Sequence, residues 1–276
     1  MKQSGLPALN LLLGGLPDGL VEVSGAESCG KTTLGGNLLR QATQDDRPRV
    51  FVPIGPYDPE RLRQLGAGPD TLILRPADWY SLARALQIFC AGVDDALIII
   101  DGPSGLETAD EEQNPLVCEP DWAQQRADIT YALHMIAEAA RAHACTVVLL
   151  DEIRSDIGWK GRHKTAMVRY MDDELAAHIS LKVLRTKEQY GKLGYKRVQF
   201  KVVRALDTPP GGAVDCTLFP DTGFDPWYDL LTCLIRTGEA VPAGTYWRLR
   251  AGGQVGPGFS RASAQLQARY GGRYRW

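Results

Sequence analysis

Short apolar runs recur along the first 150 residues, and helical segments lie between them. The runs are Leu20–Gly25, Arg49–Gly55, Thr71–Pro76, Ala96–Asp101 and Cys145–Leu150. Runs of this length are typical of strands that are buried on both faces of a parallel sheet. Between the last two runs, Ile129, Leu133, Ile136 and Ala140 recur at helical spacing and predict a long amphipathic helix. The pattern predicts an α/β fold in which helices flank a mostly parallel central sheet.

The hydrophobic pattern changes after about Asp173. Segments 177–189, 196–205 and 213–219 alternate or run apolar over short distances, with glycine-rich turns between them. They predict antiparallel strands that extend the same sheet. The chain then continues as a short helix, a hairpin and a last helix, which are Trp227–Arg236, Tyr246–Gln254 and Ser260–Arg269. We expect a core over residues 1–225, a small C-terminal cap over 226–268 that packs on it, and a basic-aromatic tail over 269–276.

Composition and charge limit the class of protein. The chain has 276 residues, 44% of them hydrophobic, and a formal net charge of −2, so any basic surface must be local. Its six cysteines show neither metal-site nor disulfide-framework spacing, and Cys90 and Cys145 lie in apolar segments typical of a core. The N-terminus lacks a signal-peptide cleavage site, and no apolar run is long enough to span a membrane. We therefore expect a cytoplasmic protein with no membrane partner.

A phosphate-binding loop is the clearest motif of the chain. Residues 25–32 match the pattern G-x-x-x-x-G-K-S/T, between a predicted strand and a helix that is expected to begin near Thr33. Such a loop turns its backbone N–H groups toward phosphate oxygens, and the helix N-terminus adds partial positive charge. The lysine reaches the β- and γ-phosphates, and the hydroxyl of the last residue binds Mg²⁺. We expect ATP to contact Gly25, Glu27, Ser28, Cys29, Gly30, Lys31, Thr32 and Thr33.

The apolar strand "LIIID" ends in a single carboxylate. It belongs to Asp101, which would lie at the carboxyl end of a parallel strand, where open α/β sheets bind their ligands. In phosphate-loop proteins a carboxylate at this place belongs to the Mg²⁺ shell. The sequence therefore predicts a magnesium site formed by Thr32 and Asp101.

An ordered series of motifs resembles the core of the bacterial RecA recombinases. The series runs from about residue 5 to residue 268 and comprises "GGLPDGLVEVSGAESCGKTTL", "FVPIGPYDPERLRQLG", "LIIIDGPSGL", "LLDEIRSDIG", "VQFKVVRALDTPP" and "GFDPWYDLLTCLIRTG…AGTYWRLRAGGQVGPG". The resemblance implies an ATP-dependent enzyme that forms filaments on single-stranded DNA and exchanges strands. It also implies that Asp58 binds the amino group of adenine, and that Arg61 replaces the aromatic residue that stacks on the base.

Three departures from the family concern hydrolysis. The glutamate that activates the attacking water is replaced by Gly55 or Pro56, neither of which can accept a proton. An Asn-Gln pair that senses the γ-phosphate is replaced by Asp151-Glu152. A carboxylate about 4 Å from a phosphate oxygen would repel it by roughly 4 kcal/mol at an effective dielectric near 20, unless Glu152 itself serves as the base.

The third departure concerns the two lysines that the family places across the subunit boundary. Arg204 matches the first lysine and Leu206 the second, so half of this clamp is missing. Together the departures predict that nucleotide binding is kept and fast hydrolysis is lost. The core match begins almost at Met1, and the family's acidic C-terminal domain has no counterpart, so long filaments are not expected either.

A basic segment matches the loop with which the family grips single-stranded DNA. It spans Arg154–Tyr170, and its DNA-binding candidates are Arg154, Trp159, Lys160, Arg162, Lys164 and Arg169. Basic side chains pair with phosphates while an aromatic ring can stack on bases. We expect a mobile loop here, because no strand would accept this combination of charge and glycine. The other DNA loop of the family matches Leu106–Trp122, which is acidic and predicts weak DNA binding.

Alternative functions remain open at this stage. The chain could be an active DNA-dependent ATPase or strand-exchange recombinase, with Glu152 or a neighbouring subunit supplying the base. It could instead be a recombinase paralogue that modulates a true recombinase, or resemble the ImuA-type accessory proteins of damage-induced mutagenesis and act by protein contact. Candidate partners are single-stranded DNA, a recombinase, a polymerase and a second copy of the chain. The missing catalytic glutamate favours the modulating function.

Overall fold

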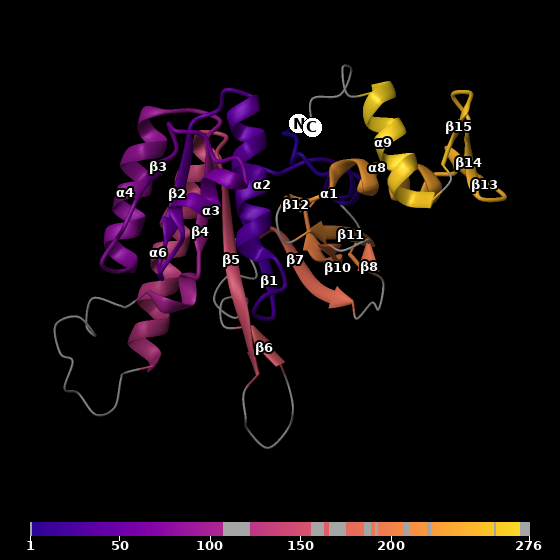
Figure 1. Cartoon of the computed structure of the whole chain (residues 1–276). Helices are drawn as coiled ribbons and strands as arrows, with labels where there is room; N and C mark the ends of the chain where they lie inside the picture. Colours follow the sequence, from indigo (N-terminus) through magenta and orange to yellow (C-terminus); the bar gives the residue numbers. More distant parts are fainter. Residues whose placement is uncertain are drawn as a thin grey trace.

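The computed structural model describes residues 2–106, 122–155, 163–165, 175–184, 189–190, 193–206, 210–219, 222–256 and 258–270. Its main sheet has ten strands within these residues, in the order β12-β11-β10-β7-β1-β5-β4-β2-β3, with β6 paired to β5 outside this path (Figure 1). The strands are β1 (Gly19–Gly25), β2 (Arg49–Pro53), β3 (Leu72–Ile73), β4 (Leu97–Asp101), β5 (Thr146–Ser155), β6 (His163–Thr165), β7 (Leu175–Leu184), β10 (Lys196–Ala205), β11 (Ala213–Phe219) and β12 (Gly223–Phe224).

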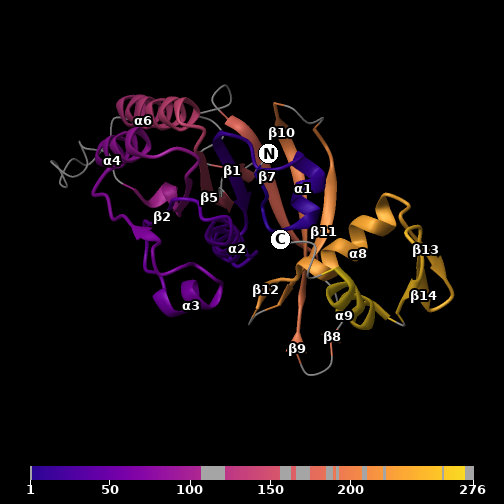
Figure 2. The same cartoon turned by 90° about the horizontal axis from the view of Figure 1, so that it is seen from above.

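Helices cover both faces of this sheet (Figure 2). They are α1 (Pro7–Leu13), α2 (Lys31–Gln44), α3 (Pro59–Gln64), α4 (Trp79–Gly92), α6 (Trp122–Ala142), α8 (Pro226–Arg236) and α9 (Gly258–Tyr270), with a 3-10 turn η1 (Pro103–Gly105). Alternate residues of the central strands enter two separate cores, because successive side chains of a strand point to opposite faces. Val23 and Leu150 pack in the core under α1 and α2, whereas Leu20 and Leu149 pack in the core under α4 and α6. The predicted α/β class with a mostly parallel sheet is confirmed.

Three element predictions need correction. The run Thr71–Pro76 forms only the two-residue β3, which lies at the sheet edge beside β2 and leaves Leu72 44% exposed instead of buried. The first of the three strands that were expected to be antiparallel, β7, pairs parallel with β1, so the sheet reverses direction between β7 and β10. The helix after the phosphate loop begins at Lys31, slightly earlier than expected.

The expectation of a strand-free basic loop is also wrong in part. Strand β5 continues past Leu150 to Ser155, and β6 pairs with it antiparallel, with Arg154 opposite Lys164. The ladder with β6 satisfies backbone groups that would otherwise need water, which lets a charged segment continue the strand. Trp159, Lys160, Arg162 and Arg169 lie outside the described residues.

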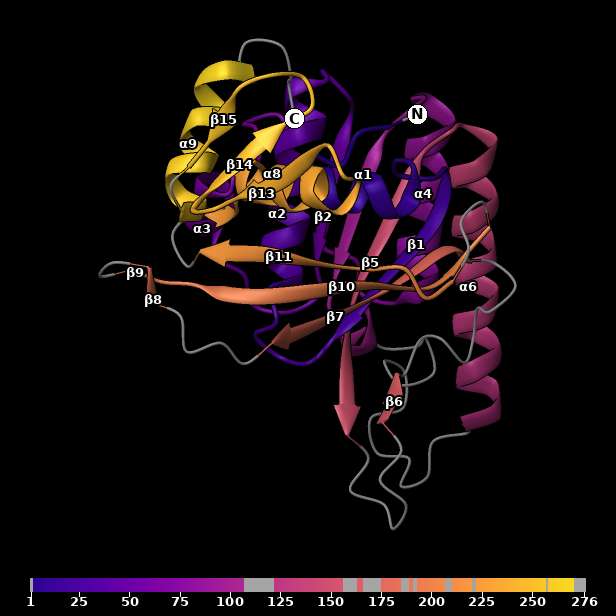
Figure 3. The same cartoon turned by 90° about the vertical axis from the view of Figure 1, so that its right-hand side faces the viewer.

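The C-terminal segment builds a small unit beside the end of the sheet (Figure 3). This unit contains a three-stranded sheet, which comprises β13 (Ala240–Ala243), β14 (Tyr246–Leu249) and β15 (Gln254–Val255). A separate hairpin, earlier in the chain, comprises β8 (Gln189–Tyr190) and β9 (Leu193–Gly194). Helix α8 contacts both α1 and β11, and α9 packs on α8. Leu231, Leu249 and Leu266 are buried in the core of this unit. Among the described residues, no helix combines the length and the apolar character that a membrane span needs.

Candidate nucleotide-binding site

The phosphate loop joins β1 to α2 and is held in shape by two glycines. A side chain on Gly25 would place its Cβ 2.5 Å from Cys29 Sγ and 2.8 Å from the carbonyl oxygen of Leu181. Gly30 has a φ of 101°, a left-handed conformation that residues with a side chain rarely adopt. Its Cβ would lie 2.7 Å from Leu218 Cδ2. Both positions therefore require glycine, as the motif predicts.

Helix α2 points its N-terminus at this loop, with Gly30 as its N-cap residue. The Lys31 ammonium donates to the carbonyl oxygens of Gly25 and Ala26, at 2.9 and 2.8 Å. The lysine thus lies along the loop itself, at the helix N-terminus, where backbone N–H groups commonly bind phosphate. Burial raises the pKa of the Cys29 thiol, and the charges of Lys31 and, to a lesser extent, Lys196 oppose this rise.

The two residues predicted to bind Mg²⁺ lie in direct contact. Thr32 Oγ1 donates to Asp101 Oδ2 at 2.7 Å, which brings the first turn of α2 to the carboxyl end of β4. Burial raises the pKa of the Asp101 carboxyl, while the Thr32 hydrogen bond and the charge of Lys31 oppose the rise. A hydroxyl and a carboxylate are the hard oxygen ligands that Mg²⁺ prefers. The donor set fits this ion, and the glycine-lined loop fits the phosphates of a nucleotide.

Strand β5 places its two carboxylates on opposite faces of the sheet. Gly25 of β1 lies opposite Glu152, and Ser24 lies opposite Asp151. Because Val23 and Leu150 face α2, Gly25 and Glu152 face the same side, two residues further along their strands. Glu152 is half-buried there beside the loop, whereas Asp151 is buried toward α4 and α6. Of the pair, only Glu152 therefore lies on the face of the sheet that carries the phosphate loop.

The segment after β2 has Gly55 and Pro56, which carry no proton acceptor, where the RecA resemblance implies a catalytic glutamate. The N–H of Ile54 donates to the carbonyl oxygen of Asp101 at 3.0 Å, which holds the segment against the end of β4. The next residues, Gly55 and Pro56, are exposed. A Cβ added to Gly55 would meet no atom within 4 Å.

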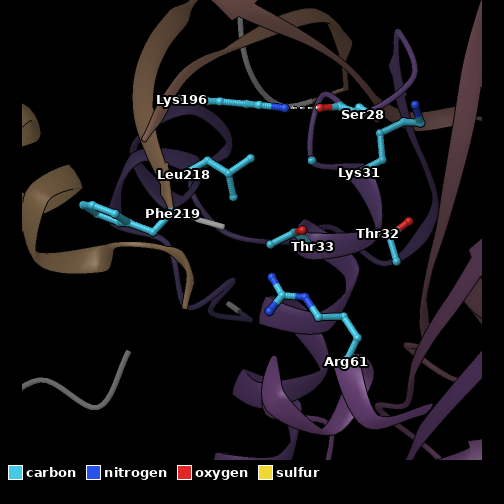
Figure 4. A pocket seen from close by; sticks show the side chains of 9 residues that line it. Ser28, Lys31, Thr32, Thr33, Arg61, Lys196, Leu218 and Phe219 are labelled. Carbon is cyan, nitrogen blue, oxygen red and sulfur yellow. Dashed lines mark hydrogen bonds between the residues drawn. The ribbon is translucent and has the colours of Figure 1, made fainter. Parts of the chain in front are cut away.

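A pocket of about 280 Å³ opens beside the loop (Figure 4). Its lining comes from the loop and α2, from α3, and from the ends of β10 and β11, and comprises Ser28, Gly30, Lys31, Thr32, Thr33, Arg61, Lys196, Leu218 and Phe219. Lys196, Leu218 and Phe219 were not identified from the sequence. No local motif marks them, since they reach the loop only through the long-range pairing of the sheet.

Comparison with known proteins agrees with this arrangement. Residues 3–225 match the family model described as the RecA N-terminal domain. The chain belongs to the RecA family. It is similar to the RecA protein of Aquifex aeolicus, with 25% identity over 92% of this chain and 75% of the relative. It is also similar to the RecA protein of Streptomyces avermitilis, with 27% identity over 94% of this chain and 70% of the relative.

The adenine-side residues of the RecA resemblance differ in their surroundings. Asp58 is the N-cap of α3, and its Oδ1 accepts from the backbone N–H groups of Glu60 and Arg61, at 2.9 and 3.1 Å. Arg61 extends from the first turn of α3 into the pocket (Figure 4). The structure thus brings Arg61 to the pocket beside the phosphate loop, and gives Asp58 a structural function as a helix cap.

Arg204, the counterpart of one RecA clamp lysine, lies on the other side of the sheet. It pairs with His178 on β7, after an irregularity in β10 between Val202 and Arg204. His178 faces away from the phosphate loop, because its neighbours Ala177 and Ile179 point into the core under α2. Arg204 therefore does not join the site of its own chain.

Proposed function

We propose that this RecA-family chain binds ATP with Mg²⁺, hydrolyses it slowly or not at all, and modulates recombination or repair on single-stranded DNA. The contact between Thr32 and Asp101 carries the binding half of this proposal. It joins the phosphate loop to the strand that supplies the second magnesium ligand, and both ligands come from separate elements of the core. Coordination by these oxygens would leave Lys31 to neutralise the terminal phosphates.

The absence of a base at the end of β2 supports slow hydrolysis. Orientation and deprotonation of the attacking water are what a catalytic glutamate contributes, and general-base catalysis contributes typically 10²–10⁴-fold to a rate. Gly55 and Pro56 cannot make this contribution. Glu152, on the loop side of β5, adds a negative charge near the terminal phosphate and thereby disfavours ATP relative to ADP.

An active DNA-dependent ATPase is the second candidate, and one observation favours it. Glu152 lies on the same face of the sheet as the phosphate loop, so its carboxylate could accept the proton of the attacking water. Arg204 would then act on the nucleotide of a neighbouring copy, as the family resemblance implies. The basic segment that begins at Arg154 supports single-stranded DNA as the shared nucleic-acid partner of both candidates.

ATP binding and turnover by the purified chain, with and without single-stranded DNA, separate the two candidates. We expect calorimetry to detect ATP·Mg²⁺ binding by the wild type and a loss of at least tenfold in affinity for Lys31→Ala. We expect turnover no higher in the wild type than in Lys31→Ala. Turnover that DNA stimulates, and that both Lys31→Ala and Glu152→Gln remove, would instead establish the ATPase with Glu152 as its base. Absence of any nucleotide binding would refute both.

The DNA half of the proposal has its own measurement. Replacing Lys160, Arg162 and Lys164 with alanine should weaken binding of a fluorescent single-stranded oligonucleotide and flatten its dependence on salt, because fewer counterions are released. Replacing the exposed basic residues Arg63, Arg84 and Arg250, on other surfaces, serves as the charge-matched control. Equal affinity and slope in the two triple variants would show that the basic segment does not bind DNA.

A further inference from the structure

Lys196 is a third cation at the phosphate loop and comes from a distant part of the chain. Its ammonium donates to the carbonyl oxygen of Ser28 at 3.3 Å, across 168 positions of sequence (Figure 4). It is the first residue of β10 and lies opposite Leu218 of β11. The ring of the preceding residue, Tyr195, packs against Phe219 with 5.9 Å between centroids, which fixes the strand end where Lys196 begins.

The pocket that Lys196 lines has one sign of charge. Lys31 and Arg61 supply the other two cations, and none of the described residues that line the pocket carries a carboxylate. In Figure 4 Lys196 and Arg61 enter from opposite sides, with Thr33 between them. Clustering of three positive groups in one pocket is unfavourable unless an anion is bound, and such a pocket concentrates anions from solution.

The place of Lys196 in the pocket indicates which part of an anionic ligand it would contact. Lys31 lies at the start of the loop on Gly25 and Ala26, and is assigned to the β- and γ-phosphates. Lys196 lies at Ser28, and Thr33 and Arg61 line the same pocket. A nucleotide whose terminal phosphates occupy the loop continues through this pocket with the phosphate nearest the ribose, then the sugar and the base.

We propose that Lys196 is a nucleotide-binding residue, which binds the phosphate nearest the ribose in the same chain. This inference rests on the proposed nucleotide binding and adds a residue outside the phosphate-loop motif. The ammonium exchanges a contact with a neutral carbonyl for a hydrogen bond to phosphate, in which the acceptor carries the opposite charge. Since that phosphate is present in both ADP and ATP, Lys196 contributes equally to both, whereas Lys31 favours ATP.

The ADP and ATP affinities of Lys196→Ala test the proposal. Calorimetry with ADP and with a non-hydrolysable β,γ-imido analogue of ATP should show a loss of roughly tenfold for each nucleotide, in line with the removal of one charge-assisted contact. The affinity of Lys196→Ala for both nucleotides should also depend less steeply on salt concentration than that of the wild type. Lys196→Arg, which keeps the charge and the donors, should bind both nucleotides within about threefold of the wild type.

Lys201→Ala is the matched control, because Lys201 is exposed on the same strand but alternates onto the face away from the loop. If Lys196→Ala binds both nucleotides as Lys201→Ala does, the assignment of Lys196 is overturned while nucleotide binding stands. A loss for the ATP analogue alone would equally overturn it, because the residue would then act on the terminal phosphate. If the wild type binds neither nucleotide, the proposed function fails, and the assignment of Lys196 fails with it.

Discussion

In the proposed function, Gly55 occupies the position that decides whether bound ATP is hydrolysed. The preceding residue is tied to the end of β4 by its backbone, so the position lies close to Asp101. Its φ is not in the left-handed region that only glycine adopts freely, and a Cβ would enter open space. A side chain can therefore be introduced here without strain in the fold.

Gly55→Glu should raise ATP turnover at least tenfold above the wild type, because a carboxylate at this position can accept the proton of the attacking water. Steady-state phosphate release with and without single-stranded DNA measures the effect. Gly55→Met, a side chain of similar length without a proton acceptor, is the control. Equal turnover of the two variants would show that loss of the base is not what limits hydrolysis.

Some residues of the site are placed by a local sequence motif, and others by the long-range pairing of strands. The loop glycines and Lys31 follow from a motif. The contact of Thr32 with Asp101 agrees with the rule that parallel strands end at the same edge, while binding of ATP and Mg²⁺ by these residues stays a prediction. Lys196 could not be predicted, because its place at the loop depends on the register of β10 against β7 and β11. Arg204 was identified by position in the sequence, yet the side of the sheet on which it lies depends on an irregularity in β10.

At the scale of elements, the central strand β1 carries polar residues through a buried layer. Glu22 and Ser24 are buried, and Ser24 Oγ lies 2.8 Å from Nε2 of the buried His178 on β7. This hydrogen bond joins the two strands immediately before the phosphate loop. No sequence pattern predicted it, since His178 has no ligand spacing and its partner lies 154 residues away.

Ser24→Ala should lower the free energy of unfolding by about 1–3 kcal/mol, since it removes a buried hydrogen bond and leaves the imidazole nitrogen without this partner. Urea denaturation measures the loss. Ser180→Ala is the matched control, because Ser180 lies opposite Ser24 on β7 but is only half-buried. An equal effect of the two substitutions would indicate that the contact with His178 does not stabilise the pairing of β1 with β7.

Strand direction was the least predictable property of the elements. The apolar composition of a buried run such as Ala96–Asp101 predicts a strand, and β4 forms there as expected. The parallel pairing of β7 with β1 joins segments far apart in the sequence, and the alternation of apolar and polar residues does not encode its direction. The apolar run Thr71–Pro76 predicted a longer strand than forms. Only the two-residue β3 forms there, at the sheet edge, where it pairs with β2 alone among the described strands.

At the scale of the whole molecule, a buried carboxyl links the main sheet to the C-terminal unit. Asp229 of α8 is fully buried, and its Oδ1 accepts from the backbone N–H of Thr217 in β11 at 3.2 Å. Burial raises the pKa of Asp229 well above its usual value, while the hydrogen bonds from Thr217 and Cys216 oppose the rise. The same strand β11 ends at the pocket beside the phosphate loop with Leu218 and Phe219, so the C-terminal unit and this pocket both pack on β11.

This raised pKa makes the stability of the molecule depend on pH. Above about pH 4 the unfolded chain releases the proton of Asp229, whereas the folded chain retains it until the pH reaches the higher folded pKa. The free energy of unfolding should therefore fall as pH rises through that interval, and Asp229→Asn should remove this fall. We expect the variant to gain stability relative to the wild type between pH 5 and pH 8 in denaturant titrations. Asp46→Asn, at an exposed turn, is the control, and parallel curves for Asp229→Asn and the wild type would contradict a protonated Asp229 at the junction of β11 and α8.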